Sequence, residues 1–407
     1  MLPEGRGKRQ IMKHIDDFTI HRFRGMREAK LEALGQINLL VGGNNSGKTS
    51  VLEAISLFCD PLNRRNWSNV ASARETGSLR SNLSISLNDR LLWLFPHDGL
   101  YPREDLFPHD KLFPQEDRAE LSLSASGSFP PKNVMARHEK FSEVIKERIP
   151  GYAVGEDVGQ RDDSSYVERE REVEGIRIEA NVSLRNDANA VPEELLTKTF
   201  KFPDYGVLPR ESEGTREIRS LPVRSINGCS HRSSEVSSAL WTDVIYDDAK
   251  LQTIKLLQLF DPDIQDVDIV APGELAPSIS VKHKKLGRAP LSAFGDGLRR
   301  VFTLASAIPG AKDGLLLIDE LEIAVHTRML EKTFNWLVEF CCQYNVQLFA
   351  TTHSLEAVDA IIDACKDKEI DLVGYRLQRD DVETTTKRFD KEYLKQLREE
   401  LGVDLRW

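Results

Sequence analysis

The sequence lacks the features that mark membrane, secreted and disulfide-rich proteins. No apolar run approaches the roughly 18 residues that a membrane-spanning helix needs. Residues 1–12 are polar and basic, and no apolar stretch follows them, which excludes a secretory signal. The five cysteines form no Cys-x-x-Cys pair, which argues against a zinc knuckle and a disulfide framework. We therefore expect a cytoplasmic protein without a membrane partner.

The chain also lacks an excess of positive charge. Its 55 Lys and Arg residues are outnumbered by 65 Asp and Glu residues, so the formal net charge is −10. This balance argues against a protein that coats nucleic acid by bulk charge, but it leaves room for a local basic groove. Hydrophobic residues make up 40% of the 407 residues, which suffices for a sizeable core and excludes wholesale disorder.

A strand, a glycine-rich loop and a helix are predicted in succession near the N-terminus. Ile37–Val41 is a short apolar run, and the apolar residues between 51 and 58 have helical spacing. Between them, Gly42–Thr49 reads Gly-Gly-Asn-Asn-Ser-Gly-Lys-Thr and fits the G-x-x-x-x-G-K-[ST] pattern. A glycine turn with only a structural role is the alternative, and the strand-loop-helix context favours phosphate binding.

The residue types in this loop suit a magnesium-bound triphosphate. Glycines let backbone N–H groups curl around phosphates, and the helix that follows presents its positive N-terminal end. Lys48 would reach the β- and γ-phosphates, and the Thr49 hydroxyl would ligate Mg²⁺. We therefore predict ATP and Mg²⁺ as cofactors. The expected nucleotide-binding residues are Gly42, Asn44, Asn45, Ser46, Gly47, Lys48, Thr49 and Ser50.

Two later apolar strands end in polar residues that complete this chemistry. Residues 315–318 precede Asp319 and Glu320, so a buried strand would carry Asp319 to the metal and Glu320 to a water that attacks the γ-phosphate. Val346–Thr351 precedes His353, which would hydrogen-bond the γ-phosphate or that water. A strand that merely ends in acids and a histidine without a role are the alternatives. With the glycine loop present, we assign Glu320, His353 and Lys48 as catalytic and Thr49 and Asp319 as metal ligands.

The middle of the chain is less regular. Leu83–Leu87, Leu121–Leu123 and Ile176–Leu184 alternate apolar and polar residues, which predicts strands and an antiparallel β lobe. Alternating Glu and Arg over Glu168–Glu174 predict a solvated strand or helix face. Residues 94–117 hold four copies of Leu-aromatic-Pro-x-acid-x, which form either an expanded surface loop or a docking strip.

The spacing of the motifs predicts a divided core. Lys48 and Asp319 are 271 positions apart, more than a minimal nucleotide fold requires, so we expect an inserted middle lobe. The predicted parts are the N-terminal part of the ATPase core over 1–94, the inserted lobe over 95–260 and the C-terminal part of the core over 261–407. Helices that alternate with short apolar strands in the last part predict a mainly parallel sheet.

Taken in order, the motifs resemble those of a known family. The glycine loop, Leu291–Arg300, Ile318-Asp319-Glu320 and Thr352-His353-Ser354 are similar to the motifs of ABC-type ATPases, in the soluble branch that includes RecF, SMC and OLD-family proteins. Phe18–Gly25, which ends in Phe-Arg-Gly, also resembles that branch. The resemblance implies an α/β fold, an ABC-type P-loop ATPase head.

In such proteins two heads enclose ATP head to tail. The resemblance therefore implies a homo-oligomer, at least a dimer, in which Ser292, Gly295 and Gly297 lie against the γ-phosphate held by the other copy. The usual Leu-Ser-Gly-Gly-Gln is here Leu-Ser-Ala-Phe-Gly-Asp-Gly, so the contacting residue among the three stays open. His326 matches a histidine often found at this place in the OLD-like group, and no glutamine loop is assigned.

The resemblance implies a Mg²⁺-dependent ATPase whose ATP-driven assembly holds, senses or releases a partner effector in bacterial anti-phage defence. OLD-family nucleases carry a Toprim nuclease domain after these motifs, and only 54 residues follow His353. We therefore expect the effector, a nuclease or toxin, to be a separate protein. The alternative is a DNA-repair or chromosome-associated ATPase similar to RecF and SMC, in which basic residues over Lys282–Arg300 would contact DNA. A scaffold without turnover is disfavoured by Glu320.

Overall fold

A computed structural model describes residues 13–406 except for 75–84, 97–119, 130, 151–165, 185–193, 205–219, 272–276 and 381–382. Most of the Leu-aromatic-Pro repeats lie outside the described residues. In the first copy, Leu94 and Phe95 are fully buried. Phe95 stacks on Trp67, with 6.1 Å between the ring centroids. Among the described residues, no helix is both long enough and apolar enough to cross a membrane.

The core is a six-stranded sheet in the order β15-β14-β3-β13-β12-β8. Its five parallel strands are β3 (Ile37–Val41), β8 (Val223–Ile226), β12 (Leu315–Ile318), β13 (Gln347–Thr351) and β14 (Leu372–Arg379). β15 (Thr384–Asp390) pairs antiparallel with β14. Every residue of β3, β12 and β13 is buried, as in strands that are covered on both faces. The predicted mainly parallel core sheet is confirmed.

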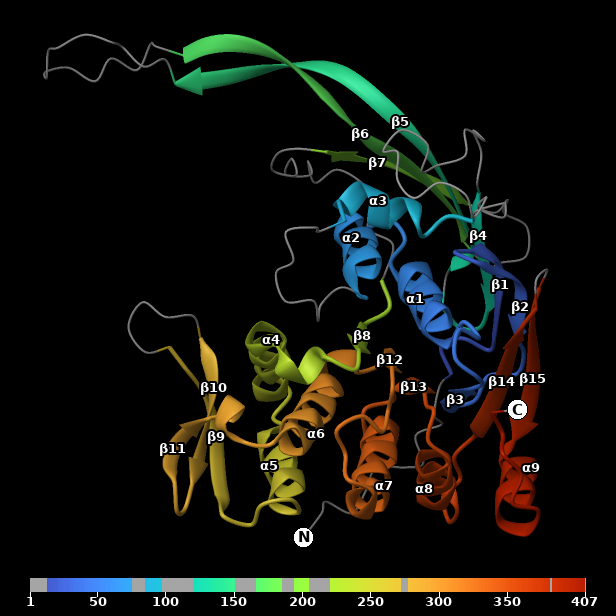
Figure 1. The fold of residues 1–407 in the computed structure, drawn as a ribbon, viewed down its shortest axis with the longest axis vertical. Coiled ribbons are helices and arrows are strands. Elements are labelled where there is room, and N and C mark those ends of the chain that lie inside the picture. The colour runs from blue at the N-terminus through green and yellow to red at the C-terminus, as the bar shows by residue number, and fades with distance from the viewer. Residues whose placement is uncertain are drawn as a thin grey trace, which may run out of the picture.

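Helices cover both faces of this sheet, and the strand residues alternate between the two cores. In β12, Leu316 and Ile318 pack into the core formed with the later helices, and Leu315 and Leu317 pack into the core formed with the N-terminal part of the chain. The N-terminal helices are α1 (Lys48–Cys59), α2 (Arg64–Ser72) and α3 (Leu87–Leu92). The later helices are α4 (Ser234–Tyr246), α5 (Lys250–Gln258), α6 (Asp296–Ala307), α7 (Thr327–Gln343), α8 (Leu355–Cys365) and α9 (Lys391–Lys395) (Figure 1).

The predicted strand over Leu83–Leu87 is wrong. Leu83 lies outside the described residues, and α3 begins at Leu87. The Ser86 hydroxyl accepts a hydrogen bond from the Asp89 backbone N–H at 3.0 Å, so Ser86 caps the helix. Capping satisfies one of the N–H groups that a helix start leaves without a partner, and it outweighs the short apolar alternation.

The second sheet is the antiparallel β lobe that the sequence predicts. Its order is β2-β1-β4-β5-β6-β7, and all neighbours pair antiparallel. The strands are β1 (Asp17–Phe23), β2 (Met26–Leu31), β4 (Leu121–Ser126), β5 (Pro131–Pro150), β6 (Tyr166–Leu184) and β7 (Leu195–Pro203). Within the range predicted as an inserted lobe, β4–β7 extend this sheet, and β8 joins the core sheet. The predicted boundaries stay predictions.

The outer halves of β5 and β6 project from the body as a two-stranded ribbon (Figure 1). Opposite charges face one another where Lys146 pairs with Glu170, and their side chains lie 3.6 Å apart. Such cross-strand pairs favour one register over a slipped one. The described residues of Glu168–Glu174 are mostly exposed, so this run is a solvated strand face.

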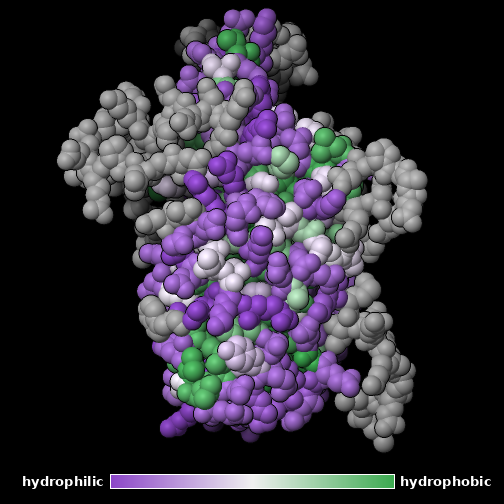
Figure 2. All heavy atoms as spheres, turned by 90° about the vertical axis from the view of Figure 1, so that its right-hand side faces the viewer, coloured by the Kyte–Doolittle hydropathy of each residue, from purple (hydrophilic) through white to green (hydrophobic). Residues whose placement is uncertain are grey.

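A third, three-stranded sheet precedes α6. Its strands, in the order β11-β10-β9, are β9 (Ile264–Val270), β10 (Ser278–His283) and β11 (Gly287–Pro290). Buried residues of β9 and β10 belong to the same core as those of α4, α5 and α6. On the side of β15 and α9, hydrophilic residues cover most of the described surface (Figure 2).

Candidate nucleotide-binding site

The glycine loop leaves β3 with a backbone that few residue types can adopt. The φ angles of Gly42, Asn45 and Gly47 are +143°, 60° and 95°. A Cβ at Gly42 would collide with the carbonyl oxygen of Leu377. Glycine meets both demands, since it lacks a Cβ and tolerates positive φ. α1 begins immediately after this loop, so its first N–H groups lie at the loop.

Lys48 is the first residue of α1, and its side chain turns back into the glycine loop. Its ammonium Nζ donates to the carbonyl oxygens of Gly42 and Gly43, each at 2.8 Å, and to the Ser46 hydroxyl at 3.3 Å. Only 5% of the residue is exposed. Burial lowers the pKa of Lys48, and the nearby carboxylates, Asp319 first among them, oppose that shift. The loop therefore holds a positive charge at the place where the motif binds phosphate.

The predicted metal ligands meet although 270 residues separate them. The Thr49 hydroxyl donates to Asp319 Oδ2 at 3.0 Å, and the Thr351 hydroxyl donates to Asp319 Oδ1 at 2.6 Å. Hydroxyl and carboxylate oxygens are the donors that Mg²⁺ prefers, so this pair fits that ion. The sequence signal that predicted it is the apolar strand ending in an acid.

Glu320 follows Asp319 with a φ of 54°, a value that is uncommon for residues other than glycine. Its backbone N–H donates to the Thr351 hydroxyl at 2.9 Å. A Cβ at Gly228 would collide with the Glu320 carboxylate, so the loop after β8 lies directly against that side chain. The sequence did not indicate Gly228. The available signal was a glycine two positions after Ile226, the last residue of β8.

His353 is held through its backbone. Its N–H donates to Glu322 Oε1 at 2.9 Å, and the Thr352 hydroxyl donates to Glu322 Oε2 at 2.7 Å. Its carbonyl accepts a hydrogen bond from Arg406 at 3.1 Å. Because β13 lies between β3 and β12, His353 follows a strand that separates the glycine loop from Glu320. Glu322 is a positioning residue that sequence reasoning missed.

The Ser50 hydroxyl accepts a hydrogen bond from Arg74 Nη2 at 2.9 Å. On the next turn of α1, the Glu53 carboxylate lies 2.8 Å from Arg24 Nε and 2.7 Å from Arg74 Nη2. Arg24 belongs to the Phe-Arg-Gly segment. These ion pairs therefore join α1 to the first hairpin and to the end of α2.

The segment over Ser292–Gly297, at the start of α6, lies apart from the glycine loop of its own chain. Ser292 is exposed, and a Cβ at Gly295 would meet open space. A Cβ at Gly297 would lie 3.0 Å from the carbonyl of Ala324, in the loop after Glu320. No hydrogen bond among the described residues joins this segment to the glycine loop.

A cleft of about 390 Å³ lies beside the glycine loop, on the side of β14. Gly43–Ser46 form one wall, and the end of β14 forms the other with Arg376 and Arg379. Arg406 completes the lining and is paired with Asp404 at 2.6 Å. β14 runs parallel to β3, so its carboxyl end lies at the edge of the sheet where such folds bind ligands. Sequence reasoning missed these three arginines.

The comparisons with known proteins agree with this geometry. A family model described as "AAA domain, putative AbiEii toxin, Type IV TA system" matches residues 61–359, well over half of the chain. The chain belongs to this AAA-domain family. The match contains the acids after β12 and His353, and it begins after the glycine loop. With the loop, the acids and the histidine at one edge of a mainly parallel sheet, the protein is an ATPase with an ABC-type P-loop fold.

Individual relatives are distant. An ATP/GTP phosphatase of Helicobacter pylori is 21% identical over an alignment of 373 residues that covers 87% of this ATPase and 89% of that protein. An uncharacterised protein of Methanocaldococcus jannaschii is 33% identical over 113 residues, or 28% of this ATPase and 99% of that protein. Among solved structures, an SMC head bound to the C-winged helix domain of ScpA is 11% identical, with a TM-score of 0.45 and coverage of 93% of this chain and 99% of that one.

Two other features of the ATPase have structural explanations. His326 caps α7, since its Nδ1 accepts a hydrogen bond from the Arg328 backbone N–H at 3.3 Å.

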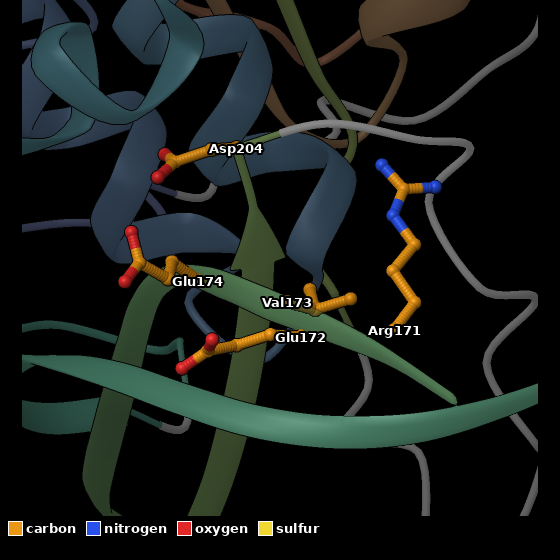
Figure 3. Close-up of a pocket in the computed structure, with 5 residues that line it drawn as sticks. All are labelled: Arg171, Glu172, Val173, Glu174 and Asp204. Carbon is orange, nitrogen blue, oxygen red and sulfur yellow. The ribbon is translucent and has the colours of Figure 1, made fainter.

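A cavity of about 190 Å³ lies beside the ribbon of β5 and β6 (Figure 3). Its lining is Arg171, Glu172, Val173, Glu174 and Asp204. Three carboxylates do not favour a phosphate, so this cavity is not a second nucleotide site.

The basic residues over Lys282–Arg300 are largely paired. Lys285 binds Asp263, Arg288 lies 3.0 Å from Asp268, and Arg299 lies 3.0 Å from Asp296. Arg300 is fully buried. Lys282 and Lys284 are exposed on and just after β10. These ion pairs neutralise most of the positive charge with which this segment could contact DNA phosphates.

Proposed function

We propose that the protein is a Mg²⁺-dependent ATPase whose ATP-bound copies associate head to tail, and that this association holds, senses or releases a separate effector, a nuclease or toxin, in anti-phage defence. The carrying observation is the meeting of Lys48, Thr49, Asp319 and Glu320 at one edge of the core sheet. The family description names a toxin and a toxin–antitoxin system, which supports an effector partner. The exposed Ser292 and Gly295 support a contact with a second copy.

Each residue has a defined part in this proposal. Lys48 and the loop N–H groups bind the β- and γ-phosphates, and Thr49 and Asp319 would hold Mg²⁺. The ion neutralises the charge of the phosphate oxygens when bound. Glu320 orients a water and accepts its proton as the oxygen attacks the γ-phosphorus, and the bond to the ADP oxygen breaks. His353 hydrogen-bonds the γ-phosphate or the water.

Assembly and partner choice test the proposal against its alternative. We expect the ATPase rate to change less than twofold when duplex or single-stranded DNA is added over a range of salt concentrations. We also expect a tagged copy to retain an effector protein with ATP and to lose it without ATP. The exposed Lys282 and Lys284 are the observation in favour of a DNA-handling ATPase. Strong, salt-sensitive stimulation by DNA without any protein partner would establish that alternative and refute ours.

The arginine cleft gives a further prediction. The Thr49–Asp319 pair lies on the β12 side of the glycine loop, so the γ-phosphate points to that side, and the sugar and base occupy the cleft on the β14 side. Arg379→Ala should weaken ATP binding about fivefold, because an exposed charged contact contributes about 1 kcal/mol. Titration calorimetry measures the change. Arg65→Ala, at an exposed position on α2, is the control and should bind as the wild type does. Equal affinities for the two variants would place the nucleotide elsewhere.

A further inference from the structure

A fully buried arginine joins α6 to the residues that follow β12. Arg300 lies on α6, and none of its surface is exposed. Its Nη1 donates to the Asn227 carbonyl at 2.6 Å, and its Nη2 donates to the carbonyls of Asp319 at 3.0 Å and Glu320 at 2.9 Å. One guanidinium therefore holds the backbone of two loops, the loop after β8 and the loop after β12.

Burial of this charge has to be compensated. Desolvation lowers the pKa of Arg300 to about 10, and the carboxylates of Glu320, Asp319 and Glu322 oppose the shift. The side chain stays charged at neutral pH. The hydrogen bonds of Arg300 go to backbone carbonyls, so the residue fixes the backbone next to Glu320. That backbone is the part with a left-handed φ, which persists only when the surroundings hold it.

A second set of contacts links the start of α6 to the same loop. Asp296, the first residue of α6, lies 2.9 Å from Arg232 Nη2. Arg232 ends the short 3₁₀ helix η1 (Ser230–Arg232), which comes two residues after Gly228. Gly228 in turn lies against the Glu320 carboxylate. The start of α6, the loop after β8 and Glu320 therefore form one connected set of contacts.

We propose that Arg300 is a positioning residue that couples Glu320 to the segment over Ser292–Gly297. This inference rests on the proposed function, in which that segment meets the γ-phosphate of a second copy. Arg300 lies about one turn inside α6, so a shift of the helix start moves its guanidinium and with it the carbonyls of Asp319 and Glu320. Association with a second copy thereby sets the carboxylate of Glu320 for attack, and an isolated copy hydrolyses ATP slowly.

The test is Arg300→Lys, which keeps the positive charge. An ammonium is a point charge on a flexible stem and does not hold these carbonyls as a planar fork does. We expect kcat to fall at least tenfold with KM unchanged, because Arg300 does not bind the nucleotide. We also expect the specific activity of the wild type to rise with protein concentration and that of the variant to stay constant. Arg90→Lys is the matched control: Arg90, on α3, donates to the Ile85 carbonyl, away from the site, so this variant should keep both properties.

A second variant keeps the inference testable if Arg300→Lys unfolds. The Arg232 side chain is 63% exposed, so Arg232→Ala should fold. It should lower kcat about threefold at unchanged KM and weaken the dependence on protein concentration. Wild-type kcat and concentration dependence in Arg232→Ala, or in a folded Arg300→Lys, would overturn the coupling. If the wild type itself did not hydrolyse ATP, the proposed function would fail instead.

Discussion

Glu320→Gln should abolish ATP hydrolysis and leave ATP binding intact. The amide is close in shape to the carboxylate, so the side chain still fits beside Gly228. The hydrogen bond from Arg300 to the backbone carbonyl of residue 320 is kept as well. An amide does not accept the proton of the attacking water, and loss of a general base lowers a rate by roughly 10²–10⁴. Phosphate release measures kcat, and titration calorimetry measures the affinity for ATP.

The same variant should also remain assembled in ATP. If ATP closes two copies around the nucleotide and hydrolysis opens them, a copy without hydrolysis stays closed. Light scattering should then show a lasting increase in mass with ATP, which wild type shows only transiently. Glu331→Gln, at an exposed position on α7, is the control and should behave as wild type. Full hydrolysis by Glu320→Gln would mean that another group activates the water.

The meeting of polar residues at the strand ends could be predicted from the sequence because it depends on local patterns. Apolar strands that end in Asp319 and His353 have a short, recognisable form, and parallel pairing brings their carboxyl ends to one edge. The Thr49–Asp319 contact follows from that rule although the residues are distant in the chain. The antiparallel lobe was predictable for the same reason, since alternation over Ile176–Leu184 is a local signal.

The residues that sequence reasoning missed depend on the tertiary fold. Arg379 and Arg406 belong to no motif, and they line the cleft beside the glycine loop only because β14 pairs with β3 and the chain returns to His353. Arg300 looks like one member of a basic run, and its burial is visible only when α6 packs onto the strand end. Gly228 carries meaning only through the neighbouring Glu320 carboxylate.

Lys48→Ala should remove ATP binding itself, in contrast to Glu320→Gln. Lys48 is the charge inside the glycine loop, and each hydrogen bond between a buried ammonium and an anion contributes about 1.5–3 kcal/mol. Loss of the contacts to two phosphates should weaken binding at least about a hundredfold. Titration calorimetry with ATP and Mg²⁺ measures this loss, and thermal unfolding shows whether the variant remains folded.

Lys366→Ala is the matched control for Lys48→Ala, because Lys366 lies on the surface at the end of α8, 3.8 Å from Glu399, and should not affect binding. Unchanged affinity in a folded Lys48→Ala variant would mean that the loop does not hold the phosphates. The assignment of Thr49 and Asp319 to the metal would then fail too, because the Mg²⁺ that they would hold is expected to bind together with the same triphosphate. A loss of binding with a normal unfolding temperature is therefore the result on which the other site assignments depend.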